Sequence, residues 1–185
     1  MALIDMIQQH LGQNEIQQIA QQLGVDPTVA QTAVSAAVPM ILGGLAGHAS
    51  QPEGKEAVQQ AIATHEGVAD DVTSVIQAGA PADVSGGGGG LLGRVFGQHR
   101  ETVQQGVQQA SGIDSEKAKK LLLMLSPIVL GMLARRQFGG QNTPQVDSGQ
   151  LAGTLRQEAQ AAQQQAPHVG GLLGKVLGMV ETPRS

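Results

Sequence analysis

The sequence predicts an all-α fold, an internally duplicated multi-helix bundle with kinked central helices. Apolar residues recur every three or four positions, which is the spacing of a buried helix face. No stretch of useful length alternates apolar and polar residues as a strand would. Two long apolar segments also match one another. The 185 residues suffice for one domain or two small ones.

The N-terminal region predicts two short helices followed by a long one. Asp26 and Pro27 together indicate the start of the long helix, because a carboxylate caps free N–H groups and proline has no N–H to satisfy. The apolar stripes of the two short helices are Leu3, Ile7 and Leu11, then Ile16, Ile19, Ala20 and Leu23.

The predicted long helix carries an apolar face and contains a proline. Pro39 removes a backbone hydrogen bond, so we expect it to kink the helix or to end it one turn early. Ser50 and Glu53 have the spacing of a capping box and predict a helix over 53–65. The apolar face of the long helix comprises Ala30, Ala33, Val34, Ala37, Val38, Ile41 and Leu45.

The second half of the chain repeats this pattern. The segment 24–46, GVDPTVAQTAVSAAVPMILGGLA, aligns without a gap with 112–134, GIDSEKAKKLLLMLSPIVLGMLA. Pro39 aligns with Pro127, and Leu-Gly follows each at the same distance. We therefore predict a first repeat at 1–79, a Gly-rich linker at 80–90 and a second repeat at 91–185. The central helices of the repeats should pack on each other in one globular unit.

Two further short helices complete the prediction. Val68, Val72, Val75 and Ile76 form an amphipathic turn set in the first repeat. In the second repeat, Asp147 and Gln150 are typical of a cap. The helix that they open carries Leu151, Leu155, Ala159 and Ala162.

Five motifs stand out as a set: IAQQLGVDP (19–27), AVPMILGGLA (37–46), GLLGRVFG (90–97), LSPIVLGMLARR (125–136) and VDSGQLAGTL (146–155). Together they resemble the bacterial YidB-like family, which is a domain of unknown function. The resemblance covers nearly the whole chain and implies an all-helical bacterial protein in the cytoplasm. It implies no catalytic or binding residue.

Composition argues against several classes of function. The net charge of −4 gives no attraction for nucleic acid, and the two aromatic residues, Phe96 and Phe138, cannot build a base-stacking platform. The absence of cysteine removes disulfides and thiolate chemistry. We expect a cytoplasmic protein, because no basic region followed by an apolar run opens the sequence.

No motif in the sequence meets the requirements of a catalytic, cofactor or metal site. Gly88, Gly90 and Gly93 fit GxGxxG, but a polar, Pro-containing stretch precedes them where a strand is required, and Arg94 and Val95 break a Walker pattern. We interpret the glycine run as part of the linker at 80–90 that leads into a helix start. No two histidines have the spacing that places both on one helix face for a metal; they are His10, His48, His65, His99 and His168.

Other polar groups near these segments carry no clear chemistry. His65 with Glu66, and Asp70 with Asp71, could converge with other groups in space, although solvated surface positions are the simpler interpretation. Ser126 on its apolar face is expected to bond back to its own helix.

Membrane insertion is a better alternative than a phosphate or metal site. Residues 27–52 contain no Asp, Glu, Lys or Arg, and Gly43 and Gly47 have GxxxG spacing. The matching stretch 121–134 has 14 residues, fewer than the roughly 17–25 that span a bilayer. Core helices therefore explain both segments. The segment 172–180, LLGKVLGMV, could bind an interface or a partner, and we expect it to pack on the core.

The sequence favours a non-catalytic structural or self-associating interaction protein. Its many glutamines give weakly charged helix faces that permit self-association. One alternative is a small-ligand or protein-binding module that uses a groove between the two repeats. A second alternative is a peripheral membrane-associated protein. We predict no enzyme activity, no cofactor and no nucleic-acid partner.

Overall fold

The computed structural model describes residues 3–65, 67–79 and 91–138, together with 153, 155–157 and 160. Within these ranges the chain forms helices and no strand, so the all-α prediction is confirmed. The elements are α1 (Leu3–His10), α2 (Gln13–Leu23), α3 (Pro27–Ala49), α4 (Pro52–Thr64), η1 (Val68–Asp70), α5 (Val72–Ala78), α6 (Leu91–Phe96), η2 (Gly97–His99), α7 (Arg100–Ser111) and α8 (Ser115–Phe138).

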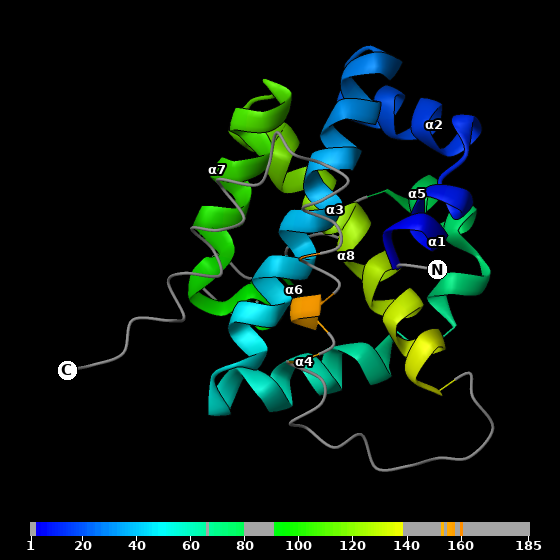
Figure 1. The fold of residues 1–185 in the computed structure, drawn as a ribbon. Coiled ribbons are helices and arrows are strands. Elements are labelled where there is room, and N and C mark those ends of the chain that lie inside the picture. Colours follow the sequence, from blue (N-terminus) through cyan, green and yellow to red (C-terminus); the bar gives the residue numbers. More distant parts are fainter. Residues whose placement is uncertain are drawn as a thin grey trace.

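The long helices α3 and α8 pack against each other at the centre of the bundle (Figure 1). The helices α2, α4, α6 and α7 also pack on α3, so α3 is covered from several sides. Every residue of 36–47 and of 121–134 is buried. The sequence predicted that only one face of each helix is buried. In these two stretches every face is buried, because other helices surround them.

Both central helices continue through their prolines. Pro39 lies inside α3 and Pro127 inside α8, so the prediction that the helices end one turn early was wrong. Each proline removes one backbone hydrogen bond, while the buried apolar turns on both sides remain packed in the core. A kink at either proline stays a prediction.

The predicted start of the long helix at Pro27 is confirmed, and the two central helices α3 and α8 begin in similar ways. Gly24 and Gly112 end the preceding helices with φ of 64° and 71°, a left-handed conformation that glycine adopts without strain. Asp114 Oδ1 accepts a hydrogen bond from the Lys117 N–H at 2.9 Å. Asp26 occupies the N-cap of α3 but makes no such bond. The duplication itself stays a prediction.

The predicted capping box at Ser50 was wrong. Helix α4 does form, but its N-cap is Gln51. Ser50 instead follows the end of α3, and its Oγ donates to the Ala46 carbonyl at 2.8 Å. The Ser50 hydroxyl therefore bonds to the end of α3 and does not cap the start of α4. The predicted turn set at Val68–Ile76 appears as η1 and α5.

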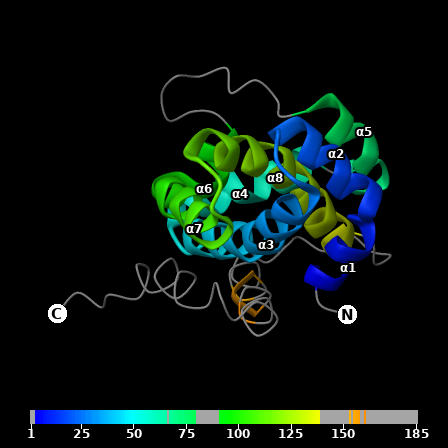
Figure 2. The same cartoon turned by 90° about the horizontal axis from the view of Figure 1, so that it is seen from above.

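Two described residues beyond α8, Leu155 and Arg156, pack on the bundle, and Arg156 does so near the end of α3. Leu155 is fully buried, and Arg156 Nη2 donates to Ser50 Oγ at 3.2 Å. Figure 2 shows this short piece beside α3. The predicted linker at 80–90, the Asp147 cap, Leu151, Ala159, Ala162, His168 and the segment 172–180 lie outside the described residues.

Within the described ranges, α3 alone is long and apolar enough to cross a membrane, with a mean hydropathy of 1.6 over its best window. In the fold, 78% of that window is buried inside the protein. A buried core helix meets the same criteria of length and composition as a membrane span. The burial of α3 supports its interpretation as a core helix.

Candidate interaction surface

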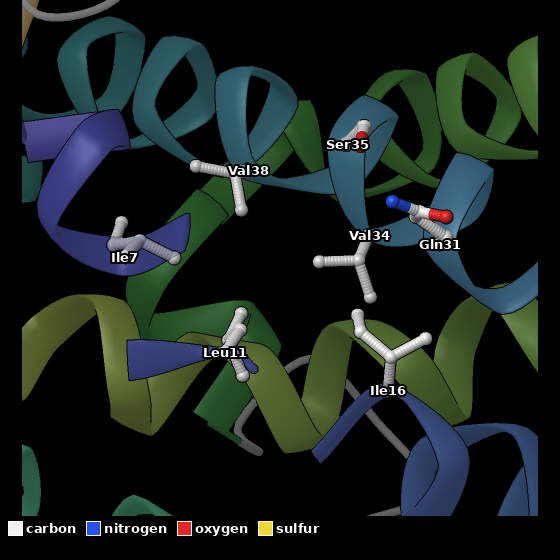
Figure 3. Close-up of a pocket in the computed structure, with 7 residues that line it drawn as sticks. All are labelled: Ile7, Leu11, Ile16, Gln31, Val34, Ser35 and Val38. Atoms are coloured by element: carbon white, nitrogen blue, oxygen red, sulfur yellow. The ribbon is translucent and has the colours of Figure 1, made fainter. Parts of the chain in front are cut away.

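A slot with an aliphatic floor and a polar rim opens between α1, α2 and the first half of α3. Its volume is about 270 Å³. Figure 3 shows side chains from all three helices around it. Five of the lining residues are aliphatic and two are polar; they are Ile7, Leu11, Ile16, Val34 and Val38, with Gln31 and Ser35.

The aliphatic residues are fixed in place by the turn between α1 and α2. The Leu11 N–H extends α1 by donating to the Ile7 carbonyl at 2.8 Å, which places both side chains on one side. Val34 and Val38 are one turn apart on α3 and face them across the slot (Figure 3). These four side chains are at most 6% exposed, and Ile16 is half-buried. The floor of the slot is therefore a rigid part of the core.

The polar residues of the slot are exposed and uncharged. Gln31 and Ser35 lie one turn apart on α3, and Thr28 and Thr32 continue the same exposed face. The Thr32 hydroxyl donates to the Thr28 carbonyl at 3.0 Å. An amide or hydroxyl can both donate and accept hydrogen bonds. The rim can therefore pair with another polar, uncharged surface.

The slot suits an apolar side chain better than a metabolite. Its volume lies just below the roughly 300–1,000 Å³ of typical small-molecule pockets. The residues that line it include no acid, base or thiol. An aliphatic side chain could enter the slot while its neighbours bond to Gln31 and Ser35.

A more open hollow lies between the two predicted repeats. Its volume is about 510 Å³. Lysines dominate its lining, but Lys120 donates to the Gln22 carbonyl at 2.5 Å and Lys117 pairs with Asp114 at 3.4 Å. The hollow is lined by Gln22, Leu23, Glu116, Lys117, Lys119, Lys120 and Leu123.

The fold brings two of the five histidines together. His48 ends α3 and is half-buried, while His99 in η2 is 6% exposed. Burial lowers the pKa of both rings, and the nearby His99 lowers the pKa of His48 further. This pair was not predictable from the sequence, because the two residues belong to different helices and share no local spacing.

His10 and His65 bond to their own helices, and His168 lies outside the described residues. His10 Nδ1 lies 2.9 Å from the Met6 carbonyl, and His65 Nδ1 lies 2.7 Å from the Ala61 carbonyl. In the part of the chain that the structure describes, no group of three or more potential metal ligands converges.

The other candidate residues have structural partners. Asp70 pairs with Arg135 at 3.3 Å, and Asp71 caps α5 by accepting from the Ser74 N–H at 3.0 Å. Ser126 Oγ donates to the Leu122 carbonyl at 2.6 Å, which confirms the predicted bond within its helix. Gly93 of the GxGxxG pattern lies inside α6, whereas Gly88 and Gly90 fall outside the described residues.

Comparison with known proteins places the chain in a family. The family model for "Bacterial protein of unknown function (DUF937)" matches residues 5–136, from α1 to near the end of α8. The chain belongs to the DUF937 family. This confirms the resemblance to the YidB-like family. No curated protein and no solved structure matches the chain. The slot and the histidine pair both lie within the DUF937 region, whereas Leu155 and Arg156 lie beyond it.

Proposed function

We propose that this DUF937 protein is a non-catalytic interaction protein of the cytoplasm that assembles with further copies of itself. The slot between α1, α2 and α3 is the surface that would make the contact. The observation that carries the proposal is the combination of a rigid apolar floor with an exposed, uncharged rim at Gln31 and Ser35. A location in the cytoplasm is supported by the absence of cysteine, since a chain without disulfides needs no oxidising compartment.

A second copy is the occupant that this surface fits best. Most soluble oligomers are symmetric, and in a two-fold contact the same patch faces itself. A patch with one sign of charge would repel its own copy, whereas amides and hydroxyls can pair with identical groups. From Pro27 to Pro52 the chain has no Asp, Glu, Lys or Arg, so α3 brings no such repulsion to the contact.

Other functions find less support in the geometry. The hollow between the predicted repeats is open, and two of its lysines already have partners in Gln22 and Asp114. The membrane alternative needs α3 to leave a core in which most of it is buried. A catalytic role would need a nucleophile or acid in a cleft, and the slot offers none among its lining residues.

The test is the molar mass of the protein as a function of concentration. Light scattering behind a sizing column, with refractive-index detection, gives the mass without an aromatic signal. We expect a mass that rises above the 19.0 kDa of one chain as the concentration increases. A mass that stays at 19.0 kDa across a wide concentration range would refute the proposal.

Charge variants at the rim locate the contact. Gln31→Glu and Gln31→Lys both place like charges opposite each other in a two-fold contact, so both should shift association to higher concentration. The control is Gln60→Glu, which adds one charge at an exposed position of α4, away from the slot. If Gln31→Lys assembles as wild type while both Glu variants do not, net charge and not the slot controls assembly.

A further inference from the structure

Half-buried His48 and buried His99 lie where three helical segments join. His48 is in the last turn of α3, and its ring donates a hydrogen bond to the backbone of Arg94 in α6. His99 is in η2, which links α6 to α7. The pair therefore lies between the end of α3 and the α6–η2 segment.

Each ring has one nitrogen without a hydrogen-bond partner. These atoms are Nδ1 of His48 and Nε2 of His99, and both are buried. A neutral imidazole can leave one nitrogen unprotonated, but an imidazolium carries a proton on both. Protonation of either ring would therefore place an N–H where no acceptor is available, which costs free energy.

The backbone at Gly54 and Gly97 leaves little room for the His48 ring to move away. A Cβ atom at Gly54 would lie 2.6 Å from His48 Nδ1, and a Cβ at Gly97 would lie 2.5 Å from the same atom. Two glycines on different elements thus enclose the His48 ring. Rotation of the ring towards solvent would require these segments to separate.

Neither ring forms an ion pair within the described part of the chain, so no acidic partner there compensates a protonated ring. The charge that acts on His48 is that of His99. The ring nitrogens also fall short of a protein metal site, which uses three or four ligands. Charged residues on the adjoining elements are Glu53, Lys55 and Glu56 of α4, Arg94 of α6, Arg100 and Glu101 of α7, and Arg156.

We propose that His48 and His99 form a proton-sensitive junction that holds α6–η2 against the end of α3 while both rings are neutral and loosens it when they are protonated. Ser50, which binds Arg156, is two residues from His48. Loosening the junction would therefore also release the C-terminal contact. The inference is independent of self-association.

The sign of the pH effect follows from the direction of the pKa changes. The folded protein holds both histidine pKa values below the ordinary 6.5. The unfolded chain therefore binds more protons as the pH falls through 6.5, and stability is lost. Each such group raises the unfolding equilibrium constant by at most about tenfold per pH unit, and the pair by at most about 100-fold.

The experiment is urea unfolding of the full chain at about pH 7.5 and about pH 5.5, on either side of the ordinary histidine pKa, followed by far-UV circular dichroism. We expect the wild-type unfolding constant to rise by about tenfold or more at the lower pH. The variant His48→Gln/His99→Gln cannot take up these protons, and the amide that replaces the His48 ring would keep a donor for the Arg94 backbone. It should lose much less stability between the two pH values.

Two controls separate the junction from general acid sensitivity. His10→Gln and His65→Gln remove histidines that bond to their own helices, and both variants should retain the wild-type loss. A pH titration of the wild-type protein, with the histidine ring resonances followed by NMR, gives a second readout. It does not require the double variant to fold. Equal wild-type stability at both pH values, or ring resonances of His48 and His99 that titrate near the ordinary 6.5, would overturn the proposal.

Discussion

Two glycines allow α3 and α7 to pack closely, and a side chain at one of them should clash with buried neighbours. Gly44 of α3 and Gly106 of α7 are both buried inside helices at this contact. A Cβ at Gly44 would lie 2.7 Å from Phe96 Cδ1 and 2.8 Å from Val103 Cγ2. Both neighbours are fully buried, so neither can move without disturbing the core.

The magnitude for Gly44→Ala follows from two opposing effects. Alanine favours the helix over glycine by about 1 kcal/mol. Overpacking a dense core costs about 1–3 kcal/mol, and two contacts below 3.0 Å against buried groups place this site in the upper part of that range. The net loss of unfolding free energy should be about 1–2 kcal/mol. The melting temperature should fall by about 2–8 °C.

Gly106→Ala is the matched control. Its Cβ would meet the thioether of Met40, at 2.9 Å from Sδ and 3.0 Å from Cε. Methionine is unbranched and adapts to small changes in shape. The cost should therefore be close to the gain in helix propensity, with a net change within about 1 kcal/mol of zero.

Thermal and urea unfolding, followed by far-UV circular dichroism, measure both variants. A Gly44→Ala variant as stable as the wild type would refute the expected clash with Phe96 and Val103. A Gly106→Ala variant that is the less stable of the two would also refute it, because rigid and flexible neighbours would then not differ as expected.

Two further predictions concern the helix starts and the halves of the chain. Asp114→Ala should lower the melting temperature more than Asp26→Ala, because the Asp114 side chain caps its helix and that of Asp26 does not. The Lys117 N–H lowers the pKa of Asp114, so this difference should be fully present at neutral pH and vanish as acid protonates the carboxyl. Residues 1–79 alone should lack a cooperative melt, because the face of α3 that packs on α7 and α8 would be exposed. A sharp thermal transition of that fragment would contradict the interdependence of the halves.

Features with a local cause were predictable from the sequence. The start of α3 at Pro27 follows from proline, whose missing N–H needs no partner in the first turn of a helix. The bond from Ser126 to Leu122 is likewise a contact within one helix. The apolar spacing of α1 and α2 placed Ile7, Leu11 and Ile19 in the core, where they lie.

Features with a long-range cause were not predictable. Ser50 has equally good local uses at the end of α3 and at the start of α4, and the sequence cannot choose between them. Whether a helix continues through Pro39 or Pro127 depends on the helices that pack around it. The effect of the His99 charge on His48 arises only when η2, which follows α6, comes near the end of α3.

The slot was missed for a related reason. Ile7, Leu11, Val34 and Val38 all read as ordinary core positions, and they are nearly buried. What distinguishes them is that α1, α2 and α3 leave a gap between their side chains. Such a gap depends on how the helices cross, and crossing geometry is not encoded in the spacing of apolar residues along one helix.

The composition of the core also constrains the kind of assembly that the surface can support. Residues 36–47 and 121–134 place a large share of the apolar side chains in two helices that are buried all round. The exposed face of α3 is left with amides and hydroxyls, without the Trp and Tyr that dominate tight interfaces. An aliphatic side chain in a slot of about 270 Å³ buries little area. Self-association through this face should therefore be reversible and dependent on concentration, and a dimer that survives high dilution would point to a different surface.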